Sequence, residues 1–559
     1  MPRPLPFVLS ASALVLMASV DGTTADRWLD WTLAGTETVI VQLSKGQAPT
    51  RPVVARAEAS GLVMPAPLPA AEEWPELPPP DEDASSLERE AFDESEDAHD
   101  AVEEDVEDDP DEPRANRPDG PILVSIARET WIFARPQFSS RRLGYLRAGA
   151  IVGRDAEPAR TQGCKGGWYA IRPHGFVCVG SRASLDAMHP VAQLSSRRPD
   201  ASGLPYQYVQ SRYPTPPLYA RLPDEAQQRK VEHSLDHHRR KHERLSRDPD
   251  FTPFPTPEPI PSLLADGALV PALDGRDRGA DTVSLGNARV RSGFALLGTY
   301  DHGDRRFGLT TEMALIPLDR TRVVAESTMQ GVHLSDEFPL PVALVRSKHA
   351  RRYVRHPETG ALAIEGSVPW RSALALTGKS IRRGGEIYLE ARDGSFVEQD
   401  RVVRIDKFRK APGWARGDKK WVDVSILEQS LVAYEGRRPV FATLVSTGAD
   451  GLQDHEESHA TIQGTFLIHT KHVSVTMDGD DEGDEFDLRD VPWVQYFTEG
   501  YALHGAYWHD DFGTPRSHGC VNLAPRDAAW LFGWTDPQVP DGWHAALSLK
   551  KGTTVHIHP

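Results

Sequence analysis

Residues 503–523 read LHGAYWHDDFGTPRSHGCVNL, and this stretch decides how the rest of the 559-residue chain is interpreted. A thiol needs a nearby base to become a nucleophile, because its ordinary pKa is about 8.5, and imidazole is the usual partner. Glycines interrupt any helical pattern, so we predict a strand, a loop and a second strand. The stretch combines one cysteine, three histidines and three glycines: Cys520, His504, His509, His518, Gly505, Gly513 and Gly519.

Two motifs in this stretch resemble the catalytic signature of the L,D-transpeptidases, the YkuD-like family. His504 is followed by glycine, and after a spacer the chain reads Ser517-His518-Gly519-Cys520-Val521-Asn522. The resemblance extends over residues 420–559, where the chain also carries a strand, Gln429, Tyr434 and Ser446-Thr447-Gly448 in the family's order. It implies a β-sandwich catalytic domain at residues 418–559.

The resemblance also implies a reaction, which is acyl transfer through a thioester on peptidoglycan tetrapeptide stems. Cys520 is expected to attack the carbonyl before D-Ala, and His504 to take the thiol proton. A neighbouring stem would then receive the acyl group in a 3–3 cross-link, although relatives also use a protein lysine, a D-amino acid or water. No cofactor is expected.

Each motif position receives a role by the same resemblance. The backbone carbonyl of Gly505 is expected to orient His504, and amides of His518, Gly519 and Cys520 to stabilise the oxyanion. His518 is expected to assist the site without being its base. Ser517 and Asn522 are predicted to fix the loop. Four further side chains are candidates for the substrate cleft: Tyr501, Trp508, His509 and Arg516, of which Arg516 suits a stem-peptide carboxylate.

The chain departs from the family pattern in one region. Relatives often have Thr-Pro-x-Gly where this chain has Thr461-Ile462-Gln463-Gly464, preceded by an insertion, Ala449–Ala460. The insertion contains His455–His459, which reads HEESH and formally matches a zinc-peptidase motif. Nearby glycines and the missing apolar periodicity argue against the helix that such a site needs. We therefore predict a polar surface loop.

Other candidate ligand groups are weaker. Residues 478–487 open like a calcium loop, but Arg489 stands where the closing glutamate is needed, so we predict a solvated hairpin tip. Histidines in the predicted helix Pro223–Ser246 occur at i,i+4 spacing, yet a solvated basic face explains them. A zinc site at Cys520 would quench its thiolate. We predict no metal site.

The N-terminus is typical of an exported protein. Residues 1–25 resemble a secretory signal, with Arg3 before the apolar run Phe7–Val20. An uncleaved anchor is the alternative, but the run is short and no other stretch could span a bilayer. We therefore expect no stable membrane span after cleavage and a location in the periplasm or cell envelope.

Charge is concentrated in one segment. Residues 71–114 hold 21 Asp or Glu against two Arg, a net of −19, so the remainder of this −18 chain sums to about +1. Such composition predicts disorder, and we assign residues 26–119 to a Pro-rich acidic linker. We expect it to be a solubilising spacer, with an electrostatic tether to a basic partner or to wall-bound cations as the alternative. Nothing in the composition indicates nucleic-acid binding.

Three β-rich regions precede the catalytic domain in a mainly β, multidomain chain. Residues 120–186 resemble a bacterial SH3-like barrel, in which Cys164 and Cys178 either form a disulfide or stay as two thiols. Residues 187–282 are assigned to a linker with one basic helix, and 283–410 to one or two small β modules. A non-catalytic wall-binding protein is the alternative function, and the oligomeric state is not predicted.

Overall fold

The computed structural model describes residues 120–408, 411–479, 486–498 and 500–559, together with two short strands nearer the start. The chain divides into two compact units, Met1–Pro79 and Pro80–Pro559. In the first unit, β1 (Phe7–Ser10) pairs antiparallel with β2 (Thr38–Val41). The acidic segment and most of the predicted signal lie outside the described residues. Within the described part, no helix is long and apolar enough to cross a membrane.

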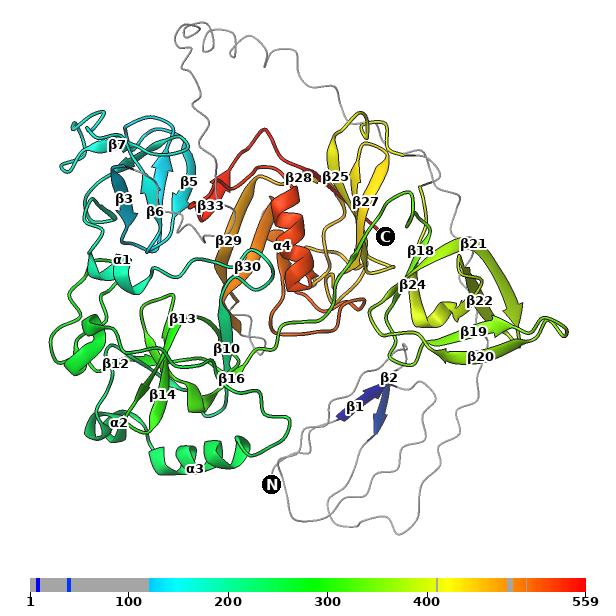
Figure 1. The fold of residues 1–559 in the computed structure, drawn as a ribbon, viewed down its shortest axis with the longest axis horizontal. Helices are drawn as coiled ribbons and strands as arrows, with labels where there is room; N and C mark the ends of the chain where they lie inside the picture. The colour runs from blue at the N-terminus through cyan, green and yellow to red at the C-terminus, as the bar shows by residue number, and fades with distance from the viewer. Residues whose placement is uncertain (1–6, 11–37, 42–119, 409–410, 480–485, 499) are drawn as a thin grey trace, which may run out of the picture. The chain divides into compact units, whose positions relative to one another are not determined.

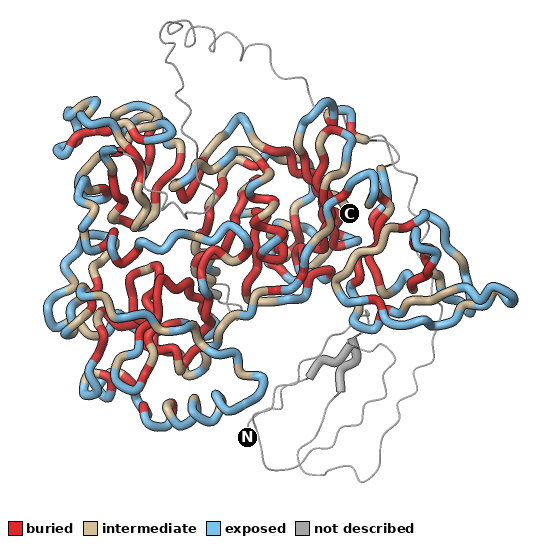
Figure 2. Tube along the Cα trace, viewed as in Figure 1, coloured by how far each residue is buried: buried red, intermediate tan, exposed pale blue. Residues whose placement is uncertain are grey.

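The C-terminal region folds as two β-sheets packed face to face. One sheet has the order β17-β27-β26-β25-β34-β28, and strands β33-β29-β30-β31-β32 face it. Apolar side chains from both sheets share one core, which Figure 2 shows as buried segments along the strands. The predicted sandwich and the mainly β architecture are confirmed. The bounds are β17 Val332–His333, β25 Lys420–Ser425, β26 Ser430–Glu435, β27 Arg438–Leu444, β28 Gly464–Leu467, β29 Thr470–Gly479, β30 Phe486–Thr498, β31 Tyr501–Gly505, β32 Val521–Leu523, β33 Ala545–Leu547 and β34 Thr554–His558.

Residues 420–444 form two consecutive antiparallel hairpins, β25–β26 and β26–β27, and both faces of β25 are buried. Val422 and Val424 point into the core between the two sheets. Trp421, one position along, points to the other face and stacks on Tyr434 with ring centroids 4.3 Å apart. Successive residues of a strand alternate between its two faces, so the two faces of β25 pack into two different apolar cores. The closing strand β34 pairs parallel to β25.

Helix α4 (Pro525–Trp534) packs against β30 and β31 (Figure 1). It begins with Pro525, whose missing N–H costs nothing at the first helical position. Its C-terminus is held by Lys471, which is fully buried and donates to the carbonyls of Phe532 at 2.5 Å and Thr535 at 2.8 Å. The negative end of the helix dipole favours a cation there, whereas burial lowers the pKa of Lys471 to about 7, so the two effects oppose each other.

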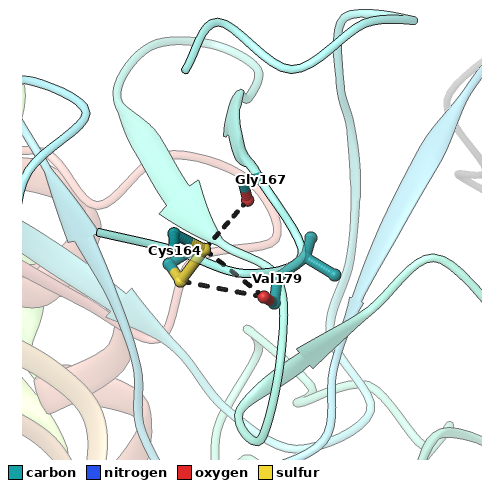
Figure 3. Close-up of a disulfide and its surroundings, with 4 residues drawn as sticks. Cys164, Gly167 and Val179 are labelled. Carbon is teal, nitrogen blue, oxygen red and sulfur yellow. Dashed lines mark hydrogen bonds between the residues drawn. A yellow bond between two sulfur atoms is a disulfide. The ribbon is translucent and has the colours of Figure 1, made fainter. Parts of the chain in front are cut away.

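Residues 120–186 form a small module of short strands around a core that includes Leu123, Ile132 and Val177. Cys164 and Cys178 are joined by a disulfide with an S–S distance of 2.01 Å (Figure 3). Since a disulfide has no S–H, the dashed lines in Figure 3 are sulfur–carbonyl contacts and not hydrogen bonds. The resemblance of residues 120–186 to an SH3-like barrel stays a prediction. The strands are β3 Ile122–Ser125, β4 Thr130–Phe133, β5 Arg142–Leu146, β6 Ile151–Gly153, β7 Trp168–Ala170, β8 Phe176–Cys178 and β9 Ala183–Ser184.

The next region differs from the predicted linker over residues 187–282. Strand β10 pairs antiparallel with β13, and Tyr208 and Tyr219 enter a shared core. The predicted single helix is two, because Ser234 adopts a left-handed conformation (φ 62°) between them. The elements are α1 Pro190–Leu194, β10 Gln207–Ser211, β11 Pro217–Tyr219, α2 Glu225–Val231, α3 Leu235–Leu245, the 3-10 helices Ser262–Gly267 and Leu318–Arg320, β12 Ser284–Asn287, β13 Gly293–His302, β14 Arg305–Thr310, β15 Leu315–Pro317 and β16 Thr321–Val323.

Residues 342–405 form a further β module with its own apolar core. This module contacts the loop that precedes Cys520. The Arg371 guanidinium forms an ion pair with the Asp510 carboxylate at 2.5 Å and donates to the backbone carbonyl of Asp510 at 2.9 Å. The elements are β18 Val342–Val345, β19 Arg351–Arg355, β20 Leu362–Ser367, β21 Ala373–Arg383, β22 Glu386–Ala391, β23 Phe396–Glu398, the 3-10 helix Gln399–Arg401 and β24 Val402–Ile405.

The small module is continuous with the sheet that contains β29 and β30, because β5 pairs antiparallel with β33. Gly144 permits this approach, since a Cβ there would lie 2.0 Å from the carbonyl oxygen of Ala545. Beside the pairing, Arg147 forms a buried ion pair with Asp490. Ser474 donates to the same carboxylate at 2.8 Å, so a charged cluster is enclosed where the modules meet.

Candidate active site

Strands β31 and β32 run parallel and bring the two ends of the sequence motif together. In their register Leu503 lies opposite Val521, and His504 opposite Asn522. Leu503 and Val521 point into the core between the sheets. Side chains alternate along a strand, so His504 projects from the opposite face of the sheet. Cys520 comes immediately before β32 and packs against an apolar cluster of Val491, Val494 and Ala502.

His504 has a defined tautomer. Its Nδ1 lies 3.2 Å from the carbonyl oxygen of Gly505, which can only accept, so Nδ1 carries the proton. The lone pair is therefore on Nε2. Burial lowers the pKa of His504 to about 4, although the bond to Gly505 opposes this shift. At neutral pH the ring is uncharged and can accept a proton.

Cys520 is partly exposed, and its environment keeps the thiol neutral. Burial raises the pKa of Cys520 to about 11, while a hydrogen bond from the backbone of Ala502 favours the thiolate. The thiol donates to the carbonyl of Gly500 at 3.5 Å. The resting pair is thus thiol and imidazole, not thiolate and imidazolium.

The turn before Cys520 is held by Ser517 and Gly519. Gly519 has φ +121°, a conformation that side chains rarely adopt, and a Cβ there would lie 2.8 Å from the ring of Tyr501. Its N–H donates to Ser517 Oγ at 3.1 Å. This differs from the prediction that the Gly519 amide serves the oxyanion, because that amide is already bonded. Ser517 Oγ donates in turn to the carbonyl of Cys520.

Two buried residues that sequence reasoning left without a role support this turn. Thr461 Oγ1 accepts from Gly448 N–H at 2.8 Å and donates to the Gly519 carbonyl at 2.7 Å. Gln429 accepts from Thr447 N–H at 2.9 Å. Thr461 and Gln429 both lie in segments that resemble the family pattern. Their hydrogen-bond partners come from other segments, so the structure was needed to find them.

The insertion Ala449–Ala460 lies beside the motif as turns and bends, so the predicted polar loop replaces the helix that a zinc motif needs. His455 approaches the Tyr501 hydroxyl, with Nδ1 at 3.4 Å. The rings of His459 and the exposed His518 are 4.5 Å apart. Among the described residues, no group of three His, Cys, Asp or Glu side chains could hold a metal ion.

The other predicted site residues differ in whether they contact the neighbours of His504 and Cys520. Asn522 bonds through its amide to His509 Nε2 at 2.9 Å, so both serve the loop. The ring of Trp508 lies 5.7 Å from that of His504. Arg516 is exposed and paired with Asp511. The acidic tip 480–485 lies outside the described residues.

Four buried neutral histidines predict acid sensitivity. Burial lowers the pKa of His472, His504 and His509 to about 4 and that of His544 to about 3. Below the ordinary value of about 6.5 the unfolded chain binds more protons than the folded one, so stability is lost as pH falls from about 6.5 toward 4. Each histidine contributes a slope of up to ~1.4 kcal/mol per pH unit.

Urea titration of the purified chain is expected to give a lower unfolding midpoint at pH 5 than at pH 7.5. The matched variant His544→Gln should reduce the difference, because it removes one of the four protonation sites. Equal midpoints at both pH values would contradict the assignment of neutral buried rings.

Comparison with known proteins is consistent with this geometry. Residues 419–557 match the YkuD family, described as the L,D-transpeptidase catalytic domain. YciB of Bacillus subtilis (strain 168), a curated protein provisionally described as an L,D-transpeptidase, is 28% identical over 124 residues. That match covers 20% of this chain and 59% of YciB, so the chain spans well under two thirds of its curated relative.

Solved structures with similar regions include three L,D-transpeptidases. The catalytic domain from E. faecium is 21% identical and matches 25% of this chain and 98% of its own, with a TM-score of 0.20. The Stackebrandtia nassauensis protein is 26% identical over 27% of this chain and 62% of its own, TM-score 0.19. The Xylanimonas cellulosilytica protein is 25% identical over 27% and 65%, TM-score 0.19. Residues 419–557 are thus the part of the chain that matches the L,D-transpeptidase catalytic domain family.

Proposed function

We propose that the protein is a peptidoglycan L,D-transpeptidase that works through a Cys520 thioester. The observation that carries the proposal is that Cys520 packs against the same apolar cluster as Trp508, whose ring lies 5.7 Å from that of His504, while Nδ1 of His504 is held by Gly505. That bond leaves Nε2 as the base. The substrate, a tetrapeptide stem, follows from the family that residues 419–557 match.

The proposed reaction has two halves. Cys520 Sγ attacks the stem carbonyl before D-Ala as its proton passes to His504 Nε2, which then protonates the leaving amine. An acceptor amine attacks the thioester, its proton returns through His504, and the thiol is restored. At a pKa of about 4 the imidazole is unprotonated at neutral pH and can accept the proton, but the pKa of the Cys520 thiol, about 11, makes the transfer uphill, so it must be coupled to attack on the carbonyl.

Reaction with a carbapenem tests the first half. The purified full chain is expected to gain the mass of one opened carbapenem, because attack on the lactam carbonyl gives a stable acyl-thiol. The matched variant Cys520→Ala should gain none. Intact mass spectrometry measures both, and a folded, reduced wild-type protein that forms no adduct would overturn the proposal in favour of a non-catalytic wall-binding protein.

The acceptor is the second question. Incubation with purified disaccharide tetrapeptides should give 3–3 cross-linked dimers and free D-Ala if a stem amine is the acceptor. Tripeptide product alone would make the protein a carboxypeptidase, and a product with an added amine would point to exchange or attachment to a protein lysine. Liquid chromatography with mass spectrometry separates these products.

The proposed location is the periplasm or cell envelope, where peptidoglycan lies. The Cys164–Cys178 disulfide supports this placement, because such bonds persist in oxidising compartments.

A further inference from the structure

We infer that Thr461 is a positioning residue for the oxyanion site: its hydroxyl fixes the Gly519 carbonyl and thereby aims the backbone N–H of Cys520 at the oxygen of the carbonyl under attack. This rests on the proposed acyl transfer and adds a residue outside the Ser517–Asn522 motif. The contacts of three short segments carry the argument.

Two backbone amides beside the thiol differ in whether they are free to donate to an oxyanion. The N–H of Gly519 donates to Ser517 Oγ at 3.1 Å and is committed to the turn. The N–H of Cys520 belongs to the same residue as the nucleophile. A carbonyl attacked by Sγ places its oxygen close to that N–H, so this amide is the natural donor to the developing charge.

The second step concerns how that N–H is aimed. In a planar trans peptide, the carbonyl of one residue and the N–H of the next point in opposite directions. The Gly519–Cys520 bond is such a peptide, so the direction of the Gly519 carbonyl determines that of the Cys520 N–H. Thr461 Oγ1 donates to this carbonyl at 2.7 Å.

The third step concerns how firmly Thr461 itself is held. The residue is 2% exposed, and its hydroxyl also accepts from the N–H of Gly448 at 2.8 Å. Gly448 is packed so tightly that a Cβ would lie 2.0 Å from the carbonyl oxygen of His459. The hydroxyl therefore has one orientation, with its hydrogen toward Gly519.

The chemistry affected is one bond-making step. Sγ forms a bond to the carbonyl carbon, the thiol proton moves to His504 Nε2, and the carbonyl π electrons move onto oxygen. Collapse of this oxyanion breaks the carbon–nitrogen bond, and the proton on His504 passes to that nitrogen. A misaimed Cys520 N–H raises the barrier to forming the oxyanion without changing the thiol.

Two probes separate these effects. Imipenem acylates through a tetrahedral oxyanion, whereas iodoacetamide alkylates Sγ by direct displacement, with no charge developing on a carbonyl oxygen. The full chain carrying Thr461→Val is expected to acylate more slowly with imipenem, by at most the factor of about 10²–10³ that loss of one oxyanion donor costs. Its alkylation by iodoacetamide is expected within about twofold of wild type, a range far smaller than the loss of one oxyanion donor produces.

Thr461→Ser is the matched control, because it keeps the hydroxyl and should acylate at a rate close to that of wild type. Thr461→Ala serves as a second hydroxyl-free variant if Thr461→Val fails to fold, with thermal unfolding used to establish the folded state. An unchanged imipenem rate in both hydroxyl-free variants would overturn the inference. So would a parallel loss of acylation and alkylation, which would mean a purely structural role.

The result for the wild-type protein separates failure of the proposed acyl transfer from failure of the role assigned to Thr461. If wild type alkylates but never acylates, the proposed acyl transfer fails and the inference fails with it. If wild type acylates and the hydroxyl-free variants do so equally fast, the proposed function stands and only the role of Thr461 is wrong.

Discussion

Replacing His504 with glutamine is expected to lower the rate constant for acylation of Cys520 by a carbapenem about 10²–10⁴-fold, the usual worth of a positioned general base. Glutamine keeps much of the volume but has no basic nitrogen. Burial raises the pKa of Cys520 to about 11, so without a base the thiol is almost entirely protonated at neutral pH. Stopped-flow or quenched mass spectrometry of adduct formation measures the rate.

The same experiment assigns the base. His518 is exposed and lies in the motif itself, so His518→Gln is the matched control and should reduce the rate far less. Activity of wild type should decline only as pH falls toward about 4, where His504 is protonated, and not near 6.5. A larger loss in His518→Gln, or an acid limb near 6.5, would transfer the role of base away from His504.

Replacing Arg147 with leucine is expected to destabilise the chain by about 3–5 kcal/mol, the cost of leaving one partner of a buried ion pair alone. Asp490 is fully buried and is held by Arg147, Ser474 and Thr311. These partners hold its pKa below the usual range, although burial opposes the shift. Without Arg147 the carboxylate would face the interior uncompensated.

Urea titration followed by tryptophan fluorescence measures the change. Removing both charges with Arg147→Leu and Asp490→Leu should recover part of the loss, since no single buried charge then remains. Arg229→Ala, which breaks an exposed pair with Glu225 and Asp236, is the control and should leave the midpoint unchanged. A midpoint for Arg147→Leu equal to that of wild type would show that the cluster does not hold the modules together.

The candidate pair has a local signal in the sequence. Cys520 and His504 stand within one short stretch, and glycines mark the strand ends, so the motif can be found without the rest of the fold. The pairing of β25, β26 and β27 is local in the same way, because neighbouring strands in the chain pair with each other. Such contacts depend on few residues and survive without knowledge of the rest of the fold.

Contacts between distant segments were not predictable. Asp490 follows an acidic run that reads as a solvated hairpin tip, yet it is buried because Arg147, some 340 residues earlier, reaches it. Residues 187–282 read as a linker because prolines and charges interrupt them, whereas β10 is completed by pairing with β13. Sequence pattern records local preference, and these outcomes depend on a partner surface.

The same reasoning explains why Thr461 received no role. A threonine before a strand is compatible with a cap, a turn or a surface position. Its two hydrogen bonds go to Gly448 and Gly519, which belong to separate segments. Only when the insertion folds beside the motif does the hydroxyl acquire a carbonyl to orient.

The pairing of β5 with β33 bears on how the catalytic domain can be studied. If residues 418–559 were expressed alone, β33 would lose the neighbour on its outer side and present unpaired backbone groups as an open sheet edge. Asp490 would lose Arg147 at the same time. Such a fragment is prone to associate through that edge, so activity lost on truncation would report aggregation rather than a missing substrate contact. In the full chain, β5 of the small module covers this edge of the sheet and so blocks association through β33.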